Sequence, residues 1–223
     1  MKKSLGICFL FVSVSLFGQN KPSSFGIITN YNFATTLDKN PQRPQDGTEQ
    51  QQSRSGIGIG IYHRLELNKR FDLESSLSYQ TKGFNTNQQF AYLGTDEYDN
   101  INFDNIYRYL DLNSNIQFKI LKNRKFIPKV YAGLGVGYLL SYKLNIDVLP
   151  FNTDYPISEY VSNKPNLFSF FYTAGVQIDV NNKFTLGFEL KNEIGNFINS
   201  GTMKAKHWIW SFKMCYNLSD ILG

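Results

Sequence analysis

Residues 109–120 read YLDLNSNIQFKI, in which apolar and polar side chains largely alternate along the chain. Successive side chains of a β-strand point to opposite faces, so this stretch predicts a strand with one apolar and one polar face. A basic turn follows at residues 122–125, and residues 130–140 resume the alternation as VYAGLGVGYLL. The two runs predict an antiparallel hairpin spanning residues 105–142. We expect the second strand to keep its alternation through Leu144, Ile146 and Val148.

The chain from residue 25 onward repeats this hairpin. Eight alternating runs cover about residues 25–36, 55–67, 71–84, 105–120, 126–148, 167–180, 184–197 and 207–218. Short turns follow the second, fourth and sixth runs, and long polar connections cover about residues 37–54, 85–104, 149–166 and 198–206. Such alternation of short and long connections is typical of outer-membrane barrels. We predict an all-β fold, an eight-stranded antiparallel up-and-down transmembrane β-barrel with short periplasmic turns and long extracellular loops.

The volume of the lumen decides which face of each strand points inward. Eight strands leave an interior that side chains just fill. The apolar faces carry bulky residues, whereas the polar faces are rich in Gly, Ser, Thr and Asn. We therefore expect the polar faces to line the lumen and the apolar faces to contact lipid. Charged residues on the inward faces are expected to pair across the lumen, with a small conducting path as the alternative: Arg64, Glu66, Asp72, Glu74, Asp111, Lys119, Lys129, Asp179, Glu189, Lys191, Glu193 and Lys213.

Aromatic residues gather near both ends of the outward faces. Rings of aromatic side chains at the two bilayer interfaces are characteristic of transmembrane barrels. The residues that we assign to these interfaces are Phe71, Tyr79, Phe118, Tyr142, Phe184, Trp208, Trp210 and Tyr216.

The first eighteen residues have the pattern of a secretory signal peptide. Lys2 and Lys3 precede an apolar run over residues 5–17, and Gly18 stands before a cleavage point at Gln19. We predict a signal peptide at residues 1–18 and one barrel domain at residues 19–223, located in the outer membrane after cleavage. No later segment approaches the ~18 consecutive apolar residues of a membrane-spanning helix. Cys215 would be the only cysteine of the mature chain, which leaves no internal disulfide.

Composition and spacing argue against several classes of site. The formal charge is 23 − 18 = +5, and the basic residues are scattered, so we expect no nucleic-acid partner. The glycine runs at residues 56–60 and 133–137 lack the spacing and the strand–turn–helix context of a nucleotide site, so we interpret them as making room in the lumen. No group of His, Cys, Asp and Glu has metal-ligand spacing. We expect no cofactor, no metal and no catalytic residue.

His207 is the residue on which an enzymatic alternative depends. Some outer-membrane barrels are lipid-modifying enzymes with a Ser, a His and an acidic residue, and His207 lies near Ser200 in the sequence. The spacing matches no such motif, so we expect that the protein is not an enzyme.

The hairpin and its connections resemble the PorT-like outer-membrane β-barrel family of Bacteroidetes-type bacteria. The resemblance rests on Tyr109-Leu110-Asp111-Leu112, on YAGLGVGY at residues 131–138, and on a signal ending before Gln19. The chain departs from the family pattern at Asn113, where a proline is frequent, and in residues 219–223, which continue past the last strand instead of ending on an aromatic residue. The resemblance implies an integral outer-membrane protein, and the member that names the family is linked to protein secretion.

Loops on a rigid scaffold commonly carry function, so we expect the extracellular loops to be the functional surface. The leading hypothesis is a non-enzymatic structural or interaction protein, monomeric, in contact with outer-membrane lipids and with envelope or secretion-system proteins. The alternatives are a secretion or transport accessory, either a narrow pore or a subunit of an envelope complex, and a lipid-modifying enzyme. The volume argument disfavours a soluble secreted barrel.

Overall fold

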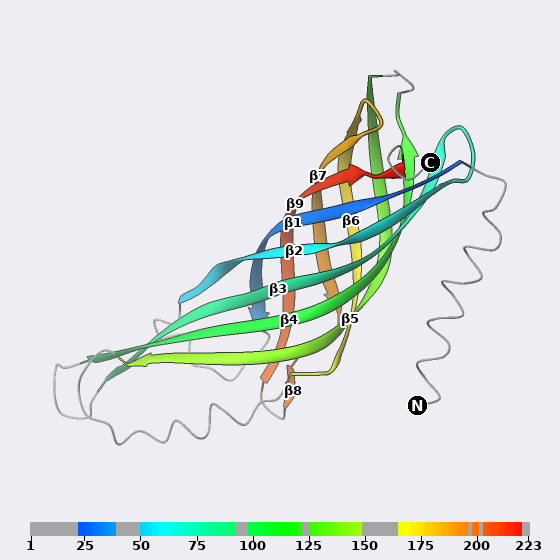
Figure 1. The fold of residues 1–223 in the computed structure, drawn as a ribbon. Coiled ribbons are helices and arrows are strands. Elements are labelled where there is room, and N and C mark those ends of the chain that lie inside the picture. Colours follow the sequence, from blue (N-terminus) through cyan, green and yellow to red (C-terminus); the bar gives the residue numbers. More distant parts are fainter. Residues whose placement is uncertain are drawn as a thin grey trace, which may run out of the picture.

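The computed structural model describes residues 22–38, 50–91, 98–121, 125–148, 165–195, 198–200 and 203–219, and its elements are strands. In chain order they are β1 (Ser23–Asp38), β2 (Gln50–Glu66), β3 (Phe71–Ala91), β4 (Tyr98–Lys119), β5 (Phe126–Val148), β6 (Phe168–Val180), β7 (Phe184–Ile194), β8 (Ile198–Ser200) and β9 (Met203–Asn217), as Figure 1 shows. The predicted signal peptide and most of the predicted loops at residues 37–54 and 149–166 lie outside these ranges.

Pairing of β1 with β9 closes the sheet into a barrel. Each strand from β1 to β7 is antiparallel to the next, β7 pairs with β9, and β9 pairs with β1 from Gly26↔Asn217 to Asp38↔Ala205. β7 pairs with β9 as far as Asn192↔Trp208, and the three-residue β8 pairs with the first residues of β9, from Ile198↔Ala205 to Ser200↔Met203. The ring of β1–β7 and β9 confirms the predicted eight-stranded antiparallel barrel. Within the described ranges, no helix is long and apolar enough to span a membrane.

The short turns have local causes in the sequence. Asn181 and Asn182 join β6 to β7 with φ angles of 52° and 56°, and asparagine tolerates this left-handed conformation better than most residues. Between β2 and β3, the side-chain oxygen of Asn68 accepts hydrogen bonds from the backbone N–H groups of Arg70 at 2.8 Å and Phe71 at 3.0 Å. Such an asparagine turn fixes the reversal and, with it, the register of the hairpin.

The alternation of the sequence becomes an alternation of burial. In β4, Asp111, Asn115 and Gln117 are at most 1% exposed, whereas the interleaved Ile116 is 56% exposed. In β5, Leu134 on the other face is 64% exposed. The barrel therefore buries its polar side chains and presents its apolar ones outward, which is the arrangement that a lipid environment requires.

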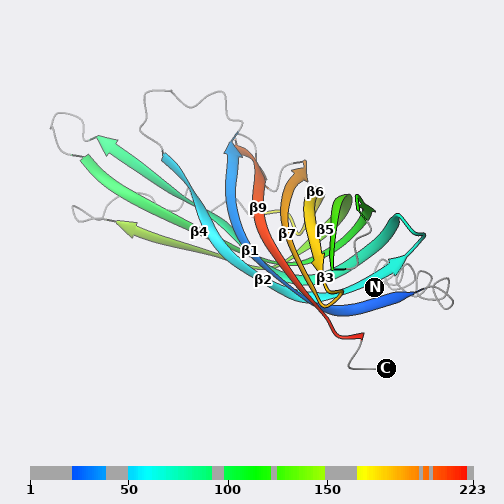
Figure 2. The same cartoon turned by 90° about the horizontal axis from the view of Figure 1, so that it is seen from above.

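β3, β4 and β5 continue beyond most of the other strands, and β2 accompanies β3 as far as Gln50↔Asn87. The β3–β4 register runs without interruption from Phe71↔Phe118 to Ala91↔Tyr98, and β4 pairs with β5 as far as Ile101↔Val148. Figures 1 and 2 show these three strands running past the ends of their neighbours at the long-loop end. The prediction of a loop over residues 85–104 is therefore wrong, because only residues 92–97 separate the two strands.

A β-bulge in β5 overturns a second expectation. Tyr109 pairs with Leu139 and Arg108 with Ser141, which leaves Leu140 as an extra residue. An extra residue moves every later side chain of the strand to the opposite face. Tyr142 and Leu144 thus share the face of Tyr107, and β5 does not keep its alternation through Leu144. The side chains of Ile146 and Val148, for which the same alternation was predicted, lie outside the described part of the strand.

Candidate functional site

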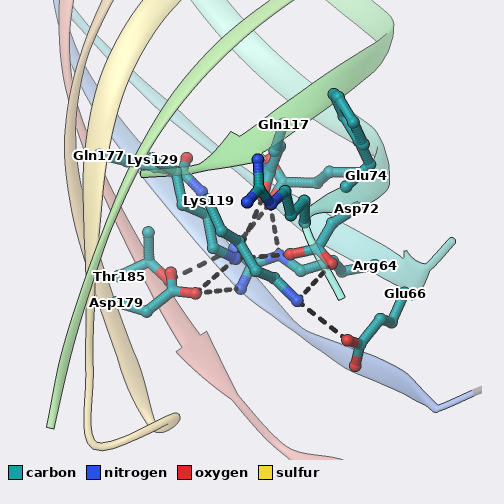
Figure 3. Close-up of polar contacts among 12 residues, drawn as sticks. Arg64, Glu66, Asp72, Glu74, Gln117, Lys119, Lys129, Gln177, Asp179 and Thr185 are labelled. Carbon is teal, nitrogen blue, oxygen red and sulfur yellow. Dashed lines mark hydrogen bonds and ion pairs between the residues drawn. The ribbon is translucent and has the colours of Figure 1, made fainter. Parts of the chain in front are cut away.

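The lumen near the short turns holds one continuous chain of ion pairs (Figure 3). Arg64 is central: its Nη2 lies 2.8 Å from Glu74 Oε2 and its Nη1 lies 3.1 Å from Asp179 Oδ2. Lys129 Nζ lies 2.6 Å from Asp179 and 2.7 Å from Asp72. The full chain alternates in sign along its whole length: Glu66, Lys119, Asp72, Lys129, Asp179, Arg64, Glu74 and Lys213.

This chain ties together strands that are distant in the sequence. Its members come from β2, β3, β4, β5, β6 and β9, and the paired side chains of Glu74 and Lys213 are at most 1% exposed. A buried charge that loses its partner costs about 3–5 kcal/mol. The alternation of sign gives each inner member two partners, so the chain fastens the barrel wall from inside.

Uncharged polar side chains fill the middle of the lumen. Ser211 Oγ donates to Asn32 Oδ1 at 2.7 Å, and Asn32 Nδ2 donates to Gln80 Oε1 at 2.7 Å. Gln80 Nε2 donates in turn to Ser78 Oγ at 2.8 Å. This relay crosses β9, β1 and β3, so hydrogen bonding continues above the ion pairs.

A second ionic group lies nearer the long-loop end. Asp111 stands between two lysines, with its Oδ2 3.0 Å from both Lys82 Nζ and Lys191 Nζ. Both cations also lie over aromatic rings: Lys82 Nζ is 4.4 Å from the centre of Tyr109, and Lys191 Nζ is 4.5 Å from the centre of Phe171. All five side chains are buried, so charge and aromatic surface together fill this layer.

Glycines stand directly opposite three of the inward aromatic residues. Phe171 faces Gly135 across β5 and β6, Tyr131 faces Gly175 across the same strands, and Tyr62 faces Gly26 across β1 and β2. A Cβ atom at Gly175 would lie 2.6 Å from the Tyr131 ring, and one at Gly26 would lie 2.7 Å from Tyr62 Cε1. Glycines of β1, β5 and β6 thus make room in the lumen for large neighbours, and a Cβ atom at Gly58 of the β2 run would likewise meet the side chain of Gln80.

Near the outer end of the lumen, Glu193 binds a serine and a histidine. Its Oε1 accepts from Ser169 Oγ at 2.7 Å and lies 3.0 Å from His207 Nδ1, while its Oε2 accepts from the backbone N–H of His207 at 2.9 Å. In a hydrolytic triad the histidine lies between the serine and the acid. Here the carboxylate takes the central place, so the serine proton is directed to Glu193.

Two small cavities adjoin these groups. The first, of about 210 Å³, opens at the short-turn end beside Arg64, Glu66, Asp72 and Lys119. The second, of about 180 Å³, lies beside Ser169 and Glu193. The described residues contain no group of three or more His, Cys, Asp or Glu able to hold a metal ion.

The twelve charged residues predicted for the lumen all lie on inward positions of the ring. Eight belong to the chain around Arg64; Asp111 and Lys191 pair with each other, Glu193 binds His207, and Glu189 accepts a hydrogen bond from Tyr131 at 3.2 Å. Lys82 and Phe171 were missed by the sequence reasoning. The alternating pattern does place both residues on the inward face, since Lys82 follows Gln80 by two residues and Phe171 lies midway between Ser169 and Thr173.

Seven of the eight predicted interface aromatics lie on outward positions. Six form cross-strand or same-strand pairs, with ring centres 5.3 Å apart for Phe71 and Phe118, 5.0 Å for Phe184 and Tyr216, and 6.5 Å for Trp208 and Trp210. Tyr79 is 37% exposed. The prediction is wrong for Tyr142, because the bulge at Leu140 turns it inward.

Tyr142 belongs instead to an aromatic cluster above the ionic groups. Its ring stacks on Tyr107 with 4.9 Å between centres, and its hydroxyl donates to Asn105 Oδ1 at 3.0 Å. Tyr107 also packs against Phe84 at 6.2 Å and against the ring of His207 at 5.3 Å. Aromatic rings therefore cover the outer end of the packed lumen.

The chain is similar to known outer-membrane proteins, both in its match to a family model and in its fold. The model of the outer membrane protein beta-barrel domain family matches residues 5–212. Among solved structures, the chain is similar to Ail, the attachment invasion locus protein of Yersinia pestis (12% identity, TM-score 0.42, covering 88% of this chain and 99% of Ail). It is also similar to the outer membrane protein OprG from Pseudomonas aeruginosa (12% identity, TM-score 0.43, 87% and 95% covered) and to Neisserial surface protein A (12% identity, TM-score 0.42, 88% and 99% covered). No curated protein matches the sequence. Because the family model matches most of the chain, the protein belongs to the outer membrane protein beta-barrel domain family and is an outer-membrane β-barrel protein.

Proposed function

We propose that this protein is a non-enzymatic interaction protein that binds an envelope partner through the part of the barrel outside the membrane. The observation that carries the proposal is the extension formed by β3, β4 and β5. β5 pairs with β6 only as far as Tyr138↔Phe168, yet it pairs with β4 as far as Val148. Among the described strands, β5 therefore has one neighbour from Ser141 onward.

An open strand edge is a binding surface of known kind. Its unpaired backbone groups accept an additional strand from another chain, and the side chains of the edge set the specificity. Lys143 is exposed on this part of β5. The outer face thus offers backbone hydrogen bonds and a cation to an extended partner segment.

The filled lumen supports this role over that of a pore. Ion pairs around Arg64, the relay through Asn32 and Gln80, and the layer around Asp111 succeed one another along the axis. The arrangement of Ser169, Glu193 and His207 likewise argues against a hydrolytic site, since the carboxylate holds the central position.

We also propose that the chain falls in the PorT-like branch of its family and carries a cleaved signal peptide at residues 1–18. The two stretches that resemble this branch face each other in the barrel, with Asp111 opposite Gly137 and Leu112 opposite Val136. Because the named member of the branch is linked to secretion, a subunit of an envelope complex is the form of interaction that we expect.

Photo-crosslinking in intact cells tests the proposal. A crosslinking residue at Lys143 is expected to capture one defined envelope protein, whereas the same residue at Leu134, on the lipid-facing part of β5, is not. Deletion of the five cross-strand pairs from Asn87↔Asn102 to Ala91↔Tyr98 shortens the extension without changing its register. The shortened barrel should keep its heat-dependent gel mobility shift and give a weaker crosslink, because Asp147 and Val148 at the end of the β5 edge lose their β4 partners. A partner captured equally by both barrels would contradict the proposal.

A further inference from the structure

The short turns of this barrel carry charge of one sign. Residues 67–70, 120–125 and 181–183 contain no Asp or Glu and hold Lys69, Arg70, Lys122, Arg124, Lys125 and Lys183. The long connections differ: residues 39–49 hold two basic and two acidic residues, and residues 92–97 hold two acidic residues only. The positive end of the barrel is thus the short-turn end.

Among these cations, Lys183 stands beside the outward aromatic residues of the short-turn interface. Lys183 directly precedes Phe184, which contacts Tyr216 at 5.0 Å between ring centres. The turn is fixed on β9, because the backbone N–H of Asn217 donates to the Lys183 carbonyl at 2.8 Å and Asn217 Nδ2 donates to the Asn182 carbonyl at 3.0 Å. Lys183 is exposed. Aromatic girdles mark the level of the lipid headgroups, so Lys183 lies at the level of lipid phosphates.

Above this turn, the apolar surface of the barrel is hollowed. A groove of about 510 Å³ lies over β7, β9, β1 and β2, and its outward lining includes Thr29, Tyr31, Ile57, Leu186, Phe212 and Met214. Thr29 is the small residue among large ones: it pairs with Met214, and Tyr31 follows it on the same face of β1. The volume falls within the range of about 300–1,000 Å³ that small-molecule sites occupy.

The groove and the turn are spaced as the parts of one lipid are. Leu186 lies three residues after Lys183 on β7 and pairs with Met214, so the groove begins about 10 Å along the strand from the basic turn. A phosphate held at Lys183 would place the first part of an acyl chain in the groove. We propose that the seam of β7, β9 and β1 is a binding site for an anionic phospholipid, with the phosphate at Lys183 and an acyl chain over Thr29.

Native mass spectrometry of the refolded, detergent-solubilised full barrel tests this site. The barrel is titrated with phosphatidylglycerol or with phosphatidylcholine of the same acyl chains, and bound lipids are counted. One basic residue near an anionic surface is worth about a fivefold change in binding. We expect Lys183→Gln to lower phosphatidylglycerol retention about fivefold and to leave phosphatidylcholine retention unchanged. The matched control, Lys206→Gln, removes a cation from the opposite, long-loop end of β9 and should change neither.

A second pair of variants tests the groove. Thr29→Phe fills the hollow and should lower retention of both lipids, whereas Ala174→Phe adds the same ring at an exposed position on β6 and should not. All variants must first show the heat-dependent mobility shift of a folded barrel. Inorganic phosphate should fail to displace phosphatidylglycerol, since the acyl chain contributes to binding. Equal retention of phosphatidylglycerol by the wild type and Lys183→Gln, or equal effects of Thr29→Phe and Ala174→Phe, would overturn the proposed site.

Discussion

Gly137 of β5 lies directly opposite Asp111 of β4, and a Cβ atom at position 137 would stand 2.6 Å from Asp111 Oδ1. The same atom would lie 3.2 Å from Cδ1 of Tyr109. A glycine at this position therefore lets Asp111 and Tyr109 both approach Lys82. The two sequence stretches that resemble the PorT-like family meet at this point of the lumen.

Gly137→Ala should consequently destabilise the barrel. The added methyl group forces the Asp111 carboxylate to move away from its lysines, and overpacking of this kind costs about 1–3 kcal/mol. The measurement is the midpoint of urea unfolding in phospholipid vesicles, followed by the gel mobility shift. Ala132→Val, which adds carbon to an exposed position of the same strand, is the control and should leave the midpoint unchanged. Equal midpoints for Gly137→Ala and the wild type would show that the close approach is not required.

Asp111 and Lys82 should differ in how much their replacement costs. Asp111→Asn leaves both Lys82 and Lys191 buried without their shared carboxylate, which we expect to cost about 3–5 kcal/mol. Lys82→Met leaves Asp111 paired with Lys191, so we expect a smaller loss of about 1–3 kcal/mol. The same urea experiment ranks the two variants. If Lys82→Met proved the more damaging, Asp111 would not be the centre of this layer.

The ring and its inward charges could be predicted because both follow from alternation with a period of two. Inside the bilayer one face meets lipid and the other meets the lumen, so each position is constrained to one chemistry. Asp72, Lys129 and Glu193 could be assigned to the lumen on this basis. Lys82 carried the same signal.

The alternating pattern did not predict every feature of the structure. It missed an inserted residue that changes the face of later side chains, and it missed strand ends that lie in different surroundings. The bulge at Leu140 has no signature in the sequence, and it reversed the side of Tyr142. Residues 85–91 and 98–104 continue the strands toward the long-loop end, where both faces of a strand can be polar and no alternation is imposed. Phe171 fits inside the lumen because it lies opposite Gly135. The sequence does not reveal that these two residues are paired, since the pairing depends on the register between β5 and β6.

Tryptophan fluorescence should report the outward face directly. Trp208 and Trp210 are the two tryptophans of the chain, and Trp210 is 45% exposed on the outward side of β9. In vesicles that contain brominated phosphatidylcholine, we expect strong quenching, greater for bromine placed close to the headgroups than for bromine at the bilayer centre. The variant Trp208→Phe isolates the signal of Trp210. Emission insensitive to brominated lipid would contradict the lipid-facing position of this strand.

The cluster of Ser169, Glu193 and His207 should prove structural. Ser169→Ala and His207→Phe are both expected to leave the composition of lipid A unchanged in a deletion strain, because the serine proton is directed to Glu193 instead of the imidazole. His207→Phe should lower the free energy of unfolding by about 1–3 kcal/mol, since it removes a buried partner of Glu193. A change in lipid A that the wild type restores and His207→Phe does not would establish the enzymatic alternative.

The wild-type barrel should not conduct ions in planar bilayers. A continuous path would have to pass Asp111 with its two lysines and the rings of Tyr109 and Phe171, and then the ion pairs around Arg64. Phe171→Ala opens space in the first of these layers only, so we expect this variant to stay closed as well. Removal of the outward Phe170 ring by Phe170→Ala is the matched control. Single-channel steps from the wild type that vanish when Arg64 and Lys129 are neutralised would instead favour a narrow pore, because current would then depend on the lumen charges.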